Sequence, residues 1–137
     1  MGKNSFLFVG VDLIKNIKIL KKAYGDKGNF TAKFNLNLIN IINKKVRTRL
    51  KVKDFKYIAT FNKKKSSMEN FIVSKKKQIF FINMKKFYLK KNEKIQTEIS
   101  KKFTISKFSK LAKSSGWRVQ KYWKDTKKYY AVFLLQS

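Results

Sequence analysis

The spacing of apolar residues changes along the chain, and each change predicts a different kind of element. The run FLFVGVD, residues 6–12, stays apolar up to its final Asp, which is typical of a parallel strand buried on both faces. Helical spacing follows, and it predicts two helices. The first carries Leu13, Ile17, Leu20 and Tyr24 and is closed by GDKG, and the second carries Phe34, Leu38, Ile41, Ile42 and Val46.

From residue 55 onward the apolar residues recur at every second position, which is the period of a strand. This pattern predicts strands over KYIATFN (56–62), NFIVS (70–74), QIFFINM (78–84), KFYLKK (86–91) and IQTEISKKF (95–103), with KKKSS (63–67) as a solvated turn. A third helix with Ile105, Phe108, Leu111 and Ala112 is expected to end at Gly116. WRVQKYW and YYAVFLLQ, separated by a KDTKK turn, predict a terminal hairpin. The chain is therefore of mixed α/β class.

The stretch IQTEIS, residues 95–100, contains one of only seven carboxylates in the chain. On a strand, Glu98 and Ser100 point to the same face, roughly 6.5 to 7 Å apart. Judged by residue types alone, this face is best explained as solvated, because polar strand faces commonly meet water. The same pair could also accept an N–H and offer a rotatable hydroxyl to the polar edge of a ring.

Composition excludes several kinds of chemistry. The 137 residues suit one domain or part of a larger one, and 43% hydrophobic residues indicate a packed core. The chain has neither cysteine nor histidine, so disulfides, thiolate sites and Ser-His triads are ruled out, and no metal site is expected. No segment resembles a signal peptide or a membrane span, so we expect a cytoplasmic protein without a membrane partner.

The net charge of +28 leaves a nucleic-acid partner open. Against it, only three of the basic residues are arginines, the side chain favoured for bidentate phosphate and guanine contacts. Lysines are spread over the whole chain together with many Asn, Ile and Phe, as codons rich in A and T would produce. We favour this compositional origin of the charge, and keep a small basic protein of ribosomal type as an alternative.

Two long segments carry a resemblance to a known family. FVGVDLIKNIKILKKAYGDKGNFTAKFNLNLINIINKKV is similar to the pattern G-T-D-L-x-K, A-Y-x-D, G-x-T-A-x-F-N-x-N, and NEKIQTEISKKFTISKFSKLAKSSGWRVQKYWKD is similar to G-E-x-I-x-T-E-x-S-x-K-[FY] followed by L-A-x-x-A-G and W-x-D. Both patterns belong to the histidine-specific, S-adenosylmethionine-dependent methyltransferases of ergothioneine biosynthesis. They occur here in the family's order and cover nearly the whole chain.

The resemblance implies a C-terminal portion of a longer enzyme, because the nucleotide-binding half of the family precedes the segment that FLFVGVD matches. No G-x-G occurs in the chain to supply a glycine-rich turn. The implied fold is the end of a Rossmann-like class I methyltransferase sheet with an inserted α+β substrate-binding domain. Residues 1–14 would be the fifth strand, 15–102 part of the substrate domain, and 103–137 the last helix and terminal antiparallel strands. One edge of the first strand would then lie open.

The resemblance also implies site residues. Glu98 and Ser100 fall on positions that read the imidazole ring of the substrate, and Tyr24 falls on a tyrosine that contacts the amino acid's backbone end; a core role for Tyr24 stays open. Asn70 stands where the family's best-known member has a methionine beside the ring. Because an amide needs polar partners that a thioether does not, this difference leaves the exact substrate open.

Three further positions have weaker assignments. Asn35 and Asn37 match the F-N-x-N motif, but helix capping or a place on the helix surface is as good an explanation as substrate contact. Asp12 lies at the carboxyl end of a strand, where α/β sheets present ligand-facing residues, although a structural role is favoured.

The chemistry implied by the resemblance is in-line methyl transfer from the sulfonium of S-adenosylmethionine, the co-substrate, to the α-amine of histidine or a related amino acid. Positioning carries most of such a reaction, so no catalytic residue is assigned and the cofactor site is expected mostly in the missing N-terminal half. That half is an expected partner, and the fragment alone is expected to be inactive. A non-catalytic module that binds an amino acid is a further alternative.

Overall fold

The computed structural model describes residues 4–25 and 27–137. Residues 1–3 of the predicted segment 1–14 and Asp26 of the GDKG stretch lie outside the described residues. The chain splits into two compact units. Unit 1 holds the described residues up to Asn16 together with Lys63–Ser67 and Lys101–Ser137, and unit 2 holds Ile17–Asn62 and Met68–Ser100.

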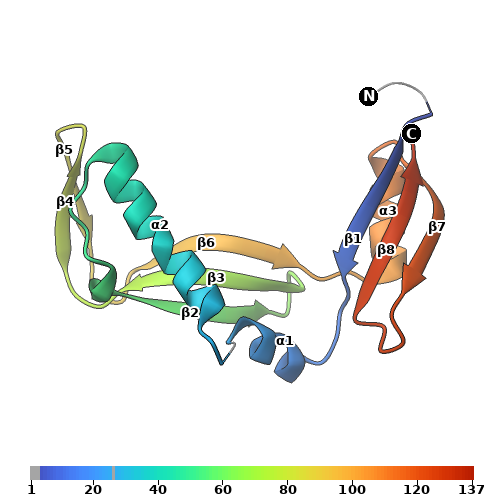
Figure 1. The fold of residues 1–137 in the computed structure, drawn as a ribbon, viewed down its shortest axis with the longest axis horizontal. Coiled ribbons are helices and arrows are strands. Elements are labelled where there is room, and N and C mark those ends of the chain that lie inside the picture. Colours follow the sequence, from blue (N-terminus) through green and yellow to red (C-terminus); the bar gives the residue numbers. More distant parts are fainter. Residues whose placement is uncertain (1–3, 26) are drawn as a thin grey trace. The chain divides into compact units, whose positions relative to one another are not determined.

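Strands and helices alternate irregularly along the chain, which confirms the mixed α/β class (Figure 1). The elements are β1 (Phe6–Asp12), α1 (Ile17–Tyr24), α2 (Phe30–Val46), the 3-10 turn η1 (Val52–Asp54), β2 (Phe55–Asn62), β3 (Ser67–Ser74), β4 (Gln78–Ile82), β5 (Lys85–Leu89), β6 (Lys94–Lys101), α3 (Ile105–Ser114), β7 (Arg118–Lys124) and β8 (Tyr130–Gln136). Each predicted strand is therefore present, with ends shifted by a few residues.

Unit 1 is a three-stranded antiparallel sheet in the order β1-β8-β7, with α3 packed against it. Alternate residues of β8, together with Val11 of β1, Leu13 just beyond it and Ala112 of α3, form the core: Val11, Leu13, Ala112, Ala131, Phe133 and Leu135. Phe133 is fully buried at the centre, where its ring centroid lies 4.5 Å from that of Phe108. The predicted terminal hairpin, β7 and β8, is confirmed.

β1 is not the doubly covered parallel strand that its continuous apolar run predicted. Among the described residues it pairs with β8 alone, in antiparallel register from Phe6↔Gln136 to Asp12↔Tyr130. Only alternate side chains reach the core, so Phe6 and Phe8 on the other face are 61% and 65% exposed. The open edge that the sequence predicted is present in the described part of the chain.

The ends of α3 follow from local hydrogen bonds. The Thr104 side chain caps the N-terminus by accepting from the backbone N–H of Lys107 at 3.1 Å. At the other end Gly116 takes φ +82°, and the N–H of Trp117 donates to the carbonyl of Ala112 at 2.9 Å. This is a Schellman ending, and it confirms the predicted stop at Gly116.

Unit 2 contains a sheet in the order β2-β3-β6 and a separate antiparallel hairpin formed by β4 and β5 (Figure 1). Its core consists of Ile39 from α2, Phe55, Ile72 and Leu89. The central strand β3 is buried along nearly its whole length. A polar side chain on β3 therefore needs partners within the sheet.

Two helical predictions were wrong in detail. Leu13 does not belong to α1, because it forms a parallel bridge with Phe103 that extends the strand beyond β1. Phe34 does not face the core and is 74% exposed. The buried side chains of α2 are Asn35 and Ile39, one turn apart, so the buried side of this helix is rotated relative to the predicted apolar stripe.

Candidate substrate-recognition site

A chain of hydrogen bonds crosses the β2-β3-β6 sheet, with one residue from each strand. The hydroxyl of Tyr57 on β2 donates to Oδ1 of Asn70 on β3 at 3.0 Å. The Nδ2 of Asn70 then donates to Oε2 of Glu98 on β6 at 2.8 Å. Neighbouring strands lie about 4.8 Å apart, so side chains of this length can join across a sheet when they share a face. We call these residues the Tyr57–Asn70–Glu98 relay.

The relay fixes the direction of every donor and acceptor in it. An ionised carboxylate only accepts, so Glu98 requires the NH₂ side of the Asn70 amide, and the amide oxygen then requires a donor, which Tyr57 supplies. Asn70 is 0% exposed, so these bonds replace the water it lost. Glu98 itself is exposed. The relay therefore holds a carboxylate at an accessible position from a fully buried anchor.

Tyr24 lies elsewhere in unit 2, on the wall of a cavity of about 490 Å³. The cavity is formed by α1, the start of α2 and β2, and Tyr57 lies on the same wall. Three lysines line it as well: Lys21, Lys56 and Lys75. Glu98, Asn70 and Ser100 do not line this cavity, so Tyr57 is the residue that the cavity and the relay have in common.

The remaining face of β6 is tied to α2. The hydroxyl of Thr97 donates to Oδ1 of Asn35 at 2.5 Å, and Nδ2 of Asn35 donates to the carbonyl of Thr31 at 3.0 Å. Asn35 is buried, and these bonds fix β6 on the helix directly beside Glu98. Ser100, two residues beyond Glu98 on β6, is half-buried.

The other two weaker candidates have contacts of their own. Asn37 is exposed on α2 and accepts from the side chain of Asn40 at 3.1 Å, which is a helix-surface arrangement. The Asp12 carboxylate in unit 1 lies 2.5 Å from Lys15 Nζ and 2.8 Å from the buried Nζ of Lys102. The favoured structural role of Asp12 agrees with these two ion pairs.

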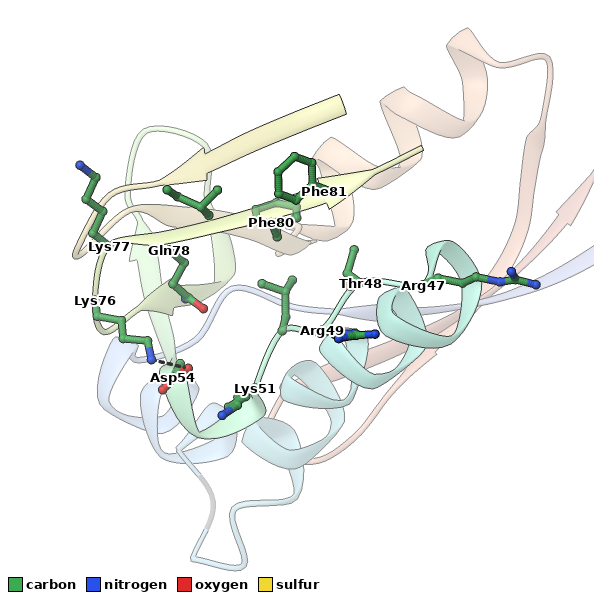
Figure 2. A pocket seen from close by; sticks show the side chains of 12 residues that line it. Arg47, Thr48, Arg49, Lys51, Asp54, Lys76, Lys77, Gln78, Phe80 and Phe81 are labelled. Atoms are coloured by element: carbon green, nitrogen blue, oxygen red, sulfur yellow. Dashed lines mark ion pairs between the residues drawn. The ribbon is translucent and has the colours of Figure 1, made fainter. Parts of the chain in front are cut away.

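A cationic cleft of about 620 Å³ lies in unit 2, between the segment that follows α2 and the start of β4 (Figure 2). Its charged side chains are Arg47, Arg49, Lys51, Lys76 and Lys77, with Asp54 as the acidic member. Lys76 Nζ lies 2.8 Å from the carboxylate of Asp54, and this hydrogen bond lowers the pKa of Asp54 below its ordinary value. None of the predicted site residues lines this cleft.

Two classes of feature are absent from the described part of the chain. Residues 4–25 and 27–137 contain no cluster of three or more acidic side chains that could hold a metal ion. No described helix is both long and apolar enough to cross a membrane.

Of the predicted site residues, the structure joins Asn70 and Glu98 directly and adds Tyr57, which the sequence did not single out. Within KYIATFN, Tyr57 is one of several apolar or aromatic strand residues, and nothing in the pattern sets it apart. The substrate contacts expected of Tyr24, Asn70, Glu98 and Ser100 stay predictions.

Comparison with known proteins identifies the class. A family model described as histidine-specific methyltransferase, SAM-dependent, matches residues 1–137, so the chain belongs to this S-adenosylmethionine-dependent family. Among curated relatives, the histidine N-alpha-methyltransferase of Mycobacterium tuberculosis (strain CDC 1551 / Oshkosh) is 26% identical over 127 residues, 91% of this chain and 40% of the relative. That of Mycolicibacterium smegmatis (strain ATCC 700084 / mc(2)155) is 25% identical over 122 residues, 87% of this chain and 38% of the relative. The chain thus spans about two fifths of the relatives' length.

Proposed function

We propose that this chain is the substrate-reading portion of a methyltransferase that transfers methyl groups from S-adenosylmethionine to the α-amine of histidine or a close analogue. The observation that supports it is the buried amide of Asn70, which donates to the carboxylate of Glu98 at 2.8 Å. A carboxylate held in this way accepts a ring N–H with little loss of side-chain entropy, since its orientation is already set. Ser100, on the same strand, would offer its hydroxyl to the same ring.

In this proposal Tyr24 contacts the backbone end of the amino acid. The three lysines around its cavity, Lys21, Lys56 and Lys75, favour an anionic group such as the substrate's carboxylate. The cavity volume of about 490 Å³ falls within the usual range for small-molecule sites. Substrate affinity in the whole protein would then depend on two separate groups of residues, one for each end of the amino acid.

The organisation that accompanies this function is also a proposal. Residues 1–14 and 103–137 would complete a Rossmann-like sheet, with residues 15–102 as part of an inserted substrate domain. The described residues do not by themselves fit a site for S-adenosylmethionine: they contain no G-x-G turn, and the carboxylate at the end of β1 is engaged by Lys15 and Lys102. We therefore derive no transfer step from this chain, and assign the cofactor site to a segment corresponding to the uncovered part of the relatives. A cytoplasmic location is consistent with this role.

The experiment combines the 137-residue chain with the part of the Mycolicibacterium smegmatis relative that the chain does not cover. Methyl transfer to L-histidine from labelled S-adenosylmethionine is measured for each piece alone and for the mixture. We expect product only from the mixture, and loss of product with Glu98→Ala. Calorimetry of the chain alone against S-adenosylmethionine should show no binding. Micromolar 1:1 binding would contradict the proposal, because the chain would then carry its own cofactor site.

A further inference from the structure

The relay contains two residues without a direct role in the function proposed above. Tyr57 is assigned no contact with the substrate, and the Asn70 amide is buried where a ligand does not reach it. Asn70 is 0% exposed, and both of its polar atoms have protein partners, Tyr57 at 3.0 Å and Glu98 at 2.8 Å. In this arrangement the amide acts on the carboxylate and not on a ligand.

We propose that Tyr57 and Asn70 are positioning residues that hold the Glu98 carboxylate in one orientation, so that the position beside it takes an aromatic N–H donor and disfavours a second carboxylate. This inference rests on the proposed function, and it names the ligand chemistry of that site. It also accounts for the presence of asparagine at position 70, where the family's best-known member has methionine. An amide that is completely buried and bonded to Tyr57 and Glu98 offers no accessible donor or acceptor to a ligand, so the requirement for a ring N–H is retained.

Hydrogen-bond polarity fixes the orientation of the Asn70 amide. If the Asn70 amide were reversed, its oxygen would face the Glu98 carboxylate and its NH₂ would face the Tyr57 hydroxyl. The oxygen of a fully buried amide would then face a carboxylate oxygen, and two acceptors cannot form a hydrogen bond. The Glu98 carboxylate therefore takes the NH₂ side of the amide, and the Tyr57 hydroxyl, which can either donate or accept, donates to the Oδ1 that remains. Tyr57 thus acts on Glu98 only through Asn70, by satisfying the amide oxygen that faces it.

The chain contains a matched control for this chemistry. Asn62 on β2 donates from Nδ2 to Oε1 of Glu69 on β3 at 3.0 Å, so it is a second Asn-to-Glu hydrogen bond within the same sheet. On strands of period two, Asn62 and Glu69 lie on the opposite faces from Tyr57 and Asn70. A substitution at Asn62 therefore repeats the chemical change without touching the relay.

The test uses the isotope-labelled 137-residue chain, with imidazole and acetate as probes in NMR titrations. The isosteric variant Asn70→Asp replaces the donor to Glu98 by an acceptor, and we expect the Kd for imidazole to rise by more than about tenfold, since a carboxylate pair at this distance repels or shares a proton. Asn62→Asp should leave imidazole binding unchanged. Acetate should cause no shifts at Glu98 or Asn70 in the wild-type chain, although the separate lysine-lined cavity beside Tyr24 can admit it.

Tyr57→Phe tests the far end of the relay with minimal disturbance of packing. The Asn70 side-chain amide should exchange about fivefold faster in this variant, which corresponds to one neutral hydrogen bond, while the Asn62 amide should not change. Imidazole binding that is equal in wild type, Asn70→Asp and Tyr57→Phe would overturn the positioning inference and leave the proposed function standing. A different outcome is also possible: the exchange of the Asn70 amide changes in Tyr57→Phe, but the wild-type chain binds no imidazole. This result would contradict the proposed ring-binding site and, with it, the proposed selection of ligands with a ring N–H.

Discussion

Replacing Glu98 should separate the stability of the relay from the recognition of a substrate. In Glu98→Ala the fully buried Nδ2 of Asn70 loses its acceptor, and an unsatisfied buried donor costs about 1 to 3 kcal/mol. In Glu98→Gln the side-chain oxygen of glutamine can still accept from Asn70, so only the charge-assisted part of the bond is lost, about 1 kcal/mol or less. We expect the free energy of unfolding of unit 2 to fall clearly in the first variant and slightly in the second.

The distribution of tryptophan makes the assay selective. Both tryptophans, Trp117 and Trp123, belong to unit 1, so indole fluorescence reports the unfolding of that unit in urea, while amide exchange of β3 reports unit 2. Glu98→Ala should reduce protection in β3 more than Glu98→Gln does. Equal losses in the two variants would refute the reasoning, because they would show that the Asn70 amide does not depend on an acceptor at position 98.

In the reconstituted enzyme, both variants should weaken the histidine-dependent reaction while S-adenosylmethionine binding stays near normal.

Three further outcomes are expected. Phe133→Ala should cost about 3 to 5 kcal/mol in urea unfolding followed by tryptophan fluorescence, because it empties the centre of the unit 1 core; a loss below about 1 kcal/mol would contradict that assignment. Asp125 accepts three backbone N–H groups, and these bonds, led by that of Tyr130, lower its pKa, so its stabilisation is present above pH 3.8 and is lost as the pH falls through the lowered value. Acid titrations of Asp125→Ala should show a shallower loss of stability in this range than the wild type, and equal slopes would argue against it. Binding of single-stranded RNA should disappear near physiological salt and barely change in Arg47→Ala/Arg49→Ala, whereas tight, salt-resistant binding would favour the nucleic-acid alternative.

The sequence identified the strands well because each is a short run with period two or a continuous apolar run bounded by polar turns. Prediction from the sequence failed where the same pattern of apolar residues fits two different kinds of structure. Leu13 stands at helical spacing from Ile17, yet its backbone continues the strand and bridges Phe103, a contact between residues far apart in sequence. The apolar run of β1 predicts a strand that is buried on both faces, but one face is exposed. The composition of a strand does not show which neighbouring elements cover it.

The candidate site was predictable only in part. Motif resemblance singled out Asn70 and Glu98, but their contact joins residues 28 positions apart, and no local pattern reports it. Asparagine is mostly exposed in proteins, so the complete burial of Asn70 could not be inferred from its type. Tyr57 was missed for the same reason, because its importance lies in the partner of its hydroxyl and not in its position within a strand.

The pairing of β1 with β8 has a consequence for how the chain folds. The backbone N–H of Ser5 donates to Oγ of Ser137 across 132 positions of sequence, and all of unit 2 lies within the loop that this pairing closes. Loop closure over such a distance changes stability little, since each doubling of length adds only about 0.6 kcal/mol, but it slows folding. During synthesis β1 emerges before unit 2 and before β8, so its pairing with β8 waits until unit 2 has been made. A strand that is made before unit 2 thus finds its partner only after unit 2, and its exposed Phe6 and Phe8 lack that neighbouring strand in the meantime.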